Sequence, residues 1–195
     1  SIDHLRMYRR YFFYFCGALL FTLVYFNSTF EVERATLEDL ANFKAATPFQ
    51  YRILVPYMVR ILRHIVPINV KHFYLLITLF FTFFLLIIFR KYMLLFLTEK
   101  YADLFSLILL YPLFWNYCAT KTYRYPSDIP AIFFFTLGIF FIVKEKWIPY
   151  YFVFIVGSFN RETICFLTFA YLFTMFGKHR TCLLYTSPSP RDRTR

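Results

Sequence analysis

The sequence predicts an all-α fold, a polytopic transmembrane helical bundle that crosses the bilayer in about six spans or partial spans. Of the 195 residues, 59% are hydrophobic and 25% are aromatic, and the mean hydropathy is +0.51. Several apolar runs approach the roughly 20 residues that a helix needs to cross a bilayer core of about 30 Å. Positively charged residues gather at the ends of these runs, which is typical of membrane proteins.

The formal net charge is +11, from 22 Lys and Arg residues against 11 Asp and Glu residues. Such a charge is compatible with nucleic-acid binding, but here the cations flank apolar runs. We therefore expect the lipid bilayer as a partner and no nucleic acid. The sequence carries no cofactor motif, and it leaves open both a divalent cation and the oligomeric state.

The first predicted span covers residues 11–26 and follows Arg6, Arg9 and Arg10. A basic flank before an apolar run is also found in signal peptides. No small-residue cleavage site follows, and more apolar runs come later, so we expect a retained helix. The positive-inside rule then predicts a cytoplasmic N-terminus in a multi-pass protein of the bacterial inner (plasma) membrane.

Residues 27–69 form an outer segment, for which we expect amphipathic interfacial helices. Thr36-x-x-Asp39 resembles a capping box and predicts a short helix over residues 37–46. Pro56 suits the first turn of a second helix that runs to about Val66.

The second helix of this segment is predicted to be basic and amphipathic. Arg60, Arg63 and His64 stand at positions i, i+3 and i+4 and therefore share one face. Helices of this kind lie on a membrane surface more readily than they span it. Two interpretations stay open: the basic face contacts lipid headgroups, or it joins Arg52 in holding an anionic lipid-linked substrate.

The remaining predicted spans are residues 71–89, 103–118, 129–143, 148–159 and 163–177. Each predicted inner end is basic, as Arg90 and Lys91 illustrate. The run 148–159 is short for a full crossing and is expected to be tilted or a half-helix. This alternation places the outer segment, the loop 119–128 and the turn 160–162 on one side of the membrane.

The two ends of the sequence look non-native. The chain starts at Ser1, so we expect the native start to be missing. From Cys182 to Asp192 it reads CLLYTSPSPRD, which resembles a translated sequencing-library adapter. We therefore expect residues 1–181 to be a truncated membrane domain and residues 182–195 a non-native tail, with a genuine disordered tail as the alternative.

Ionisable residues at the predicted membrane rim have two interpretations each. Arg161 and Glu162 follow Asn160 within an apolar stretch and suit either a structural ion pair or a site where Arg161 holds a phosphate oxygen. Asp128, at the start of a span, suits either a helix cap or a carboxylate at the mouth of a cavity. Glu31 and Glu33 follow the first span, where a carboxylate can serve as a general base.

Three motifs carry a resemblance: PFQYRILVP at residues 48–56, YPSDIPA at 125–131 and FNRET at 159–163. They resemble uncharacterised bacterial polytopic proteins, which in turn look like GT-C-type glycosyltransferases. These membrane enzymes take sugars from polyprenyl-phosphate donors. The resemblance covers roughly residues 11–177.

The resemblance implies a catalytic carboxylate in the first outer loop, which deprotonates the acceptor hydroxyl while basic residues hold the donor phosphate. Glu31 or Glu33 matches that position, although the usual Asp-Asp or Asp-Glu pair is missing. GT-C enzymes have more spans than this chain, so we expect an inactive fragment. The residues expected to bind substrate are Arg52, Arg124, Tyr125, Asp128, Asn160, Arg161 and Glu162.

The leading functional hypothesis is therefore a hexosyltransferase of the cell envelope that uses a lipid-linked sugar donor on the extracytoplasmic face. The runner-up is a transporter or flippase for a lipid-linked or anionic solute, and the third is a non-catalytic membrane subunit. A transferase should place Glu31 or Glu33 within a few ångströms of a cavity shared with Arg52, Arg124 or Arg161. A transporter should place them near the bilayer midplane, at broken helices.

Overall fold

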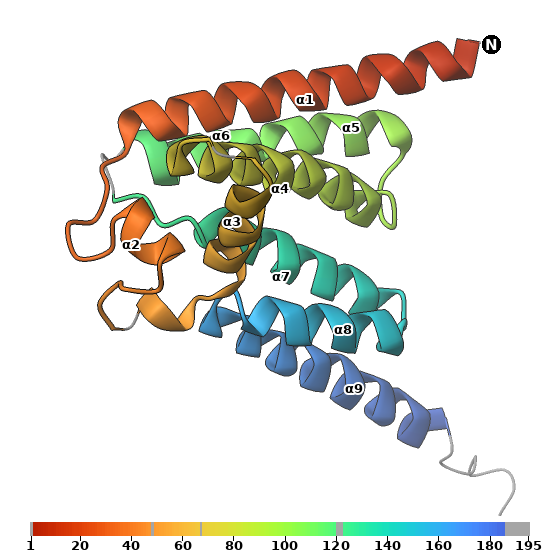
Figure 1. Cartoon of the computed structure of the whole chain (residues 1–195). Coiled ribbons are helices and arrows are strands. Elements are labelled where there is room, and N and C mark those ends of the chain that lie inside the picture. The colour runs from red at the N-terminus through yellow and green to blue at the C-terminus, as the bar shows by residue number, and fades with distance from the viewer. Residues whose placement is uncertain (1, 48, 67, 120–122, 186–195) are drawn as a thin grey trace, which may run out of the picture.

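The computed structural model describes residues 2–47, 49–66, 68–119 and 123–185 (Figure 1). In these parts the regular elements are helices. Isolated β-bridges occur, but the described residues form no strand, and the predicted all-α fold is therefore confirmed. The α-helices are α1 (Ile2–Ser28), α2 (Leu37–Ala41), α3 (Leu54–Ile65), α4 (Val70–Met93), α5 (Glu99–Ile108), α6 (Leu110–Phe114), α7 (Asp128–Val143), α8 (Trp147–Ser158) and α9 (Phe166–Tyr185). Shorter turns are η1 (Phe49–Tyr51), η3 (Glu162–Cys165) and a π-helical turn, η2 (Trp115–Ala119).

The long helices lie side by side, with α4 in the middle of the bundle (Figure 1). Helix α4 packs against α1, α3, α5 and α7, and α7 packs in turn against α8 and α9. The apolar period of α4 explains its central place, because Phe73, Ile77, Phe81 and Leu85 recur every four residues and are all buried.

Among the described residues, three helical segments are long and apolar enough to cross a membrane: His4–Ser28, Val70–Met93 and Glu99–Ala119. Helix α7 has 16 residues and α8 has 12, so at about 1.5 Å per residue both fall short of a bilayer core of about 30 Å. Three spanning helices are therefore supported, and the other three predicted spans remain shorter apolar helices. The predicted short run 148–159 corresponds to α8.

The predicted non-native tail, residues 182–195, lies only partly within the described residues. Helix α9 continues to Tyr185, so it includes the first residues of the predicted non-native tail, and residues 186–195 lie outside the described parts.

An ionic cluster joins three helices at the end of the bundle that carries the N-terminus. The Asp103 carboxylate on α5 accepts hydrogen bonds from Arg10 at 3.0 Å, from Tyr14 at 3.3 Å and from Arg90. Because these partners come from α1 and α4, the cluster fixes the spacing of three helices. The sequence analysis did not single out Asp103.

The outer segment folds as two short helices at the opposite end of the bundle. The Thr36 hydroxyl accepts a hydrogen bond from the Asp39 amide at 3.1 Å, which confirms the predicted N-cap. The helix ends at Ala41, not at residue 46, because Phe43 takes a positive φ of 57° that no right-handed helix accommodates. Helix α3 has Pro56 in its first turn, as predicted, and runs across the direction of the long helices (Figure 1).

Candidate functional site

Three segments that are far apart in the sequence meet at the end of the bundle opposite the N-terminus. The Leu54 amide donates to the Phe159 carbonyl at 3.1 Å, which joins the start of α3 to the end of α8. The Asn160 side chain donates to the Ser127 carbonyl at 2.9 Å, which joins the same turn to the start of α7. The three motifs that carry the family resemblance are therefore neighbours in space.

Asp128 and Arg161 form an ion pair at the centre of this junction. Asp128 is the first residue of α7, where the partial positive charge of the helix N-terminus favours a carboxylate. Its side chain is only 8% exposed, and a guanidinium nitrogen of Arg161 donates to it. Asp128 is therefore not the helix cap, which is Ser127, but an acidic residue of the first turn that also pairs with a cation.

A second ion pair lies beside the first and is much more exposed. Arg52 donates to Glu162 at 2.9 Å, and the Glu162 side chain is 68% exposed. Burial raises the pKa of the Asp128 carboxyl, while the charges of Arg161 and then Arg52 act to lower it. The pKa of Glu162 is lowered, first by a hydrogen bond from its own backbone amide and further by Arg52.

Several polar atoms of this junction are buried and unpaired. Among the described residues, the buried side-chain atoms without a hydrogen-bond partner include Nε of Arg52, Nε of Arg161 and Oδ1 of Asn160. Buried polar groups in native proteins normally have partners, so unpaired ones indicate a place for water or a ligand. Two of the three atoms are guanidinium donors, which suit an anionic oxygen.

An open groove of about 350 Å³ runs along the bundle surface from the Asp128–Arg161 pair. The rest of its lining, largely apolar, is Tyr117, Ala131, Ile132, Phe135, Thr163 and Phe166. Tyr117 lies in the π-helical turn η2, and such turns occur frequently at functional sites. The groove therefore combines an ionic end with an apolar wall, which fits an amphiphile with an anionic head and an apolar tail.

Tyr117 was missed by the sequence analysis, which treated residues 103–118 as a plain span. The signal was Pro112 inside that span, because proline interrupts the helical hydrogen-bond ladder. The Pro112 carbonyl accepts a hydrogen bond from the Asn116 side chain at 2.8 Å, next to Tyr117.

Arg124 is turned away from this groove and caps the C-terminal end of α1. It donates to the carbonyls of Phe26 and Thr29 at 2.9 and 2.8 Å, and to the Thr29 hydroxyl at 2.9 Å. Its guanidinium also lies 4.2 Å from the centre of the Phe26 ring. Burial lowers the pKa of Arg124, and the charge of Glu31 acts to raise it. These contacts give Arg124 a structural role.

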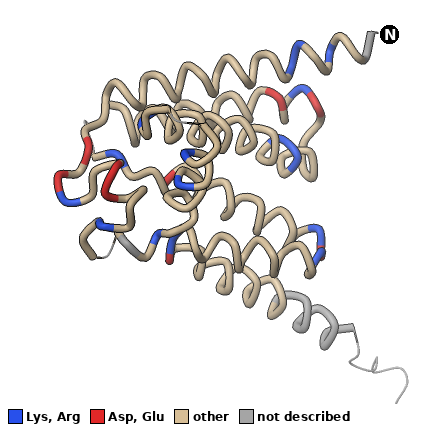
Figure 2. The backbone as a smooth tube through the Cα atoms, viewed as in Figure 1, with Lys and Arg blue, Asp and Glu red and all other residues tan. Residues whose placement is uncertain are grey.

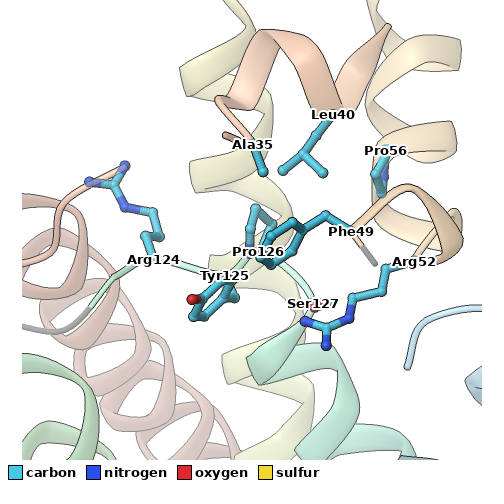
Figure 3. A pocket seen from close by; sticks show the side chains of 9 residues that line it. All are labelled: Ala35, Leu40, Phe49, Arg52, Pro56, Arg124, Tyr125, Pro126 and Ser127. Atoms are coloured by element: carbon cyan, nitrogen blue, oxygen red, sulfur yellow. The ribbon is translucent and has the colours of Figure 1, made fainter. Parts of the chain in front are cut away.

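Tyr125 contributes packing between two of these segments, its own and the one that contains Phe49. Its ring stacks on Phe49 with the ring centres 5.6 Å apart. Arg52, Arg124 and Tyr125 also line a second, smaller cavity, and Figure 3 shows Arg124 and Arg52 on opposite sides of Tyr125 there. That cavity measures only about 20 Å³, which is room for a water molecule and no larger ligand.

Glu31 and Glu33 lie at the same end of the bundle but apart from the groove. Both side chains are exposed, and neither lines the groove that Asp128 and Arg161 share. Within the described residues no group of three or more His, Cys, Asp or Glu side chains could hold a metal ion. The structure thus brings together Arg52, Asp128, Asn160, Arg161 and Glu162, and leaves Glu31, Glu33 and Arg124 outside that cluster.

No protein-family model, curated protein or solved structure matches the chain. The resemblance to GT-C-type glycosyltransferases therefore stays a prediction.

Proposed function

We propose that the chain belongs to a GT-C-type membrane glycosyltransferase that transfers a sugar from a polyprenyl-phosphate donor on the extracytoplasmic face. The observation that carries this proposal is the Asp128–Arg161 pair at one end of a largely apolar surface groove, with Arg52 close enough for its charge to act on Asp128. A polyprenyl-phosphate sugar has the matching chemistry, with an anionic head beside a long apolar chain.

The basic ends of the long helices are consistent with this orientation. The N-terminal part of α1 and the C-terminal ends of α4 and α7 carry Lys or Arg and lie at the end of the bundle opposite α2 (Figure 2). Positive residues favour the cytoplasmic side of a membrane. The groove and its ion pair would then lie at the extracytoplasmic rim.

Each part of the groove lining is assigned one role in the proposed reaction. The apolar wall takes the first isoprene units of the donor, and the guanidinium of Arg161 takes a phosphate oxygen that displaces the Asp128 carboxylate. The acceptor hydroxyl attacks the anomeric carbon, and the bond from that carbon to the phosphate oxygen breaks. The hydroxyl proton passes to the freed carboxylate, and polyprenyl phosphate leaves with the bonding electron pair.

Asp128 is a better candidate for this base than Glu31 or Glu33. It lies in the groove, and burial makes its carboxylate more basic than an exposed one. The ionisable residues of the site also stand at helix ends and in turns, whereas a transporter is expected to hold them near the bilayer midplane. This position of the ionisable residues favours the transferase over the transporter.

The test is a transfer assay in membranes that contain the protein expressed from its complete reading frame. The substrate is a radiolabelled sugar on polyprenyl phosphate, and the variants are Asp128→Asn and Glu33→Gln. A lost general base lowers the rate by about 10²–10⁴, so Asp128→Asn should lose at least about a hundredfold, while Glu33→Gln stays near the unmodified rate. If the two variants transfer sugar equally well, Asp128 is not the base.

A further inference from the structure

A second set of cations lies in a groove between the end of α2 and helix α3, which we call the basic groove. Its volume is about 570 Å³. Its lining residues are Ala41, Asn42, Lys44, Arg60, Arg63 and His64. Among the described residues, none of its four basic side chains takes part in an ion pair. By contrast, Arg52 and Arg161 each have a carboxylate partner.

The basic residues occupy one of three faces of α3. A first face is buried in the bundle through Val55, Pro56 and Val59. At about 100° per residue, Arg63, Arg60 and His64 form the next arc around the helix. The buried face holds α3 in one orientation, so the three basic side chains stay on the side of the helix that faces Lys44.

The third face of α3 is apolar and uncovered. Tyr57, Ile61 and Ile65 form a stripe beside the basic arc and are 57%, 46% and 71% exposed. On an α-helix whose opposite side is already packed, such a stripe favours contact with lipid. Basic and apolar strips therefore run next to each other along one helix.

Helix α3 packs against the part of α4 that is nearer to its N-terminal end. Met58 and Leu62 of α3 share a small apolar groove with Leu76, Ile77 and Phe80 of α4. Helix α4 begins at Val70 and is long and apolar enough to cross a membrane. At about 1.5 Å per residue, Leu76 lies about 9 Å and Phe80 about 15 Å from the start of α4, so α3 packs against the first half of this helix.

We propose that the basic groove binds the phosphate of an anionic membrane phospholipid whose acyl chains lie along the stripe of Tyr57, Ile61 and Ile65. Charge complementarity carries this assignment, because basic side chains without an ion-pair partner border an exposed apolar stripe on the same helix. The inference is independent of the proposed function, since it uses neither the Asp128–Arg161 pair nor a sugar donor.

The test places a fluorescent reporter on the stripe. In the whole chain, Trp115→Phe and Trp147→Phe remove the native tryptophans and Ile65→Trp adds one on α3. The protein is reconstituted in vesicles that contain phosphatidylglycerol or phosphatidylcholine with brominated acyl chains, which quench tryptophan on contact. We expect phosphatidylglycerol to associate with the stripe about fivefold more strongly than phosphatidylcholine does. A difference of this size corresponds to the attraction between an anionic lipid and about one basic side chain at the membrane surface.

The charge variant Arg60→Gln/Arg63→Gln/His64→Gln should bring the two lipids to equal quenching. The matched control, Arg6→Gln/Arg9→Gln/Lys100→Gln, removes exposed basic residues at the other end of the bundle and should keep the preference. Equal quenching by both lipids in the reporter protein itself would refute the proposal, as would an unchanged preference in the charge variant. Displacement of phosphatidylglycerol by inorganic phosphate, at an ionic strength matched with chloride, would show that the groove takes the soluble ion instead.

Discussion

The contribution of the buried Asp128–Arg161 ion pair to stability can be tested by replacing one partner at a time. Replacing Arg161 with Gln leaves a carboxylate that is 8% exposed without its main counter-charge. Breaking a buried ion pair from one side costs about 3–5 kcal/mol. The helix N-terminus and the nearby Arg52 offset part of that cost, so we expect Arg161→Gln to lower the free energy of unfolding by about 2–3 kcal/mol.

The matched comparison is Arg52→Gln, whose partner Glu162 is mostly exposed. Glu162 returns to water when the pair is broken, so this variant should cost no more than about 1 kcal/mol. The double variant Arg161→Gln/Asp128→Asn removes both buried charges and should be more stable than Arg161→Gln alone.

Reversible unfolding in mixed micelles with increasing SDS, followed by circular dichroism, measures all of these variants. The reasoning about burial is wrong if Arg161→Gln costs no more than Arg52→Gln, or if the double variant is the least stable of the set.

Two further predictions concern the scaffold. An added methyl at Gly138 would collide with the buried Leu167 side chain of α9. Gly138→Ala should therefore lower the free energy of unfolding by about 1–3 kcal/mol in the same measurement. A change within experimental error would show that α7 and α9 do not pack as described. Thr36→Ala removes the N-cap of α2 and should lower the free energy of unfolding by about 1 kcal/mol. Thr36→Ser keeps the hydroxyl and should lower it much less. Equal losses of stability in the two variants would mean that the cap hydrogen bond contributes little.

Apolar runs with basic flanks were sufficient to predict the long helices, and the alternation of these runs predicted that the polar turns gather on one side. Pro56 and Thr36 carried enough local information to place the starts of the two outer helices. The early end of α2 was not predictable, because the positive φ of Phe43 depends on packing and no Gly marks it.

The roles of individual charges were harder to predict than their location. Arg124 caps the carbonyls at the end of α1, a contact across 98 residues that no local pattern indicates. Glu31 and Glu33 have the sequence position expected of a base, yet Asp128 is the carboxylate that lines the groove. A buried pair such as Asp128–Arg161 depends on which turns meet in space, and sequence spacing alone does not contain that information.

The central claim, that the groove holds a lipid-linked phosphate, is tested most directly by photo-crosslinking. Benzoylphenylalanine replaces Phe135 in the groove, or Phe152 on α8 as a control that is 68% exposed on the bundle surface. With a radiolabelled polyprenyl-phosphate sugar in the membrane, the account predicts strong labelling at position 135 that Arg161→Gln abolishes, and weak labelling at position 152. Equal labelling at the two positions, unaffected by Arg161→Gln, would contradict it.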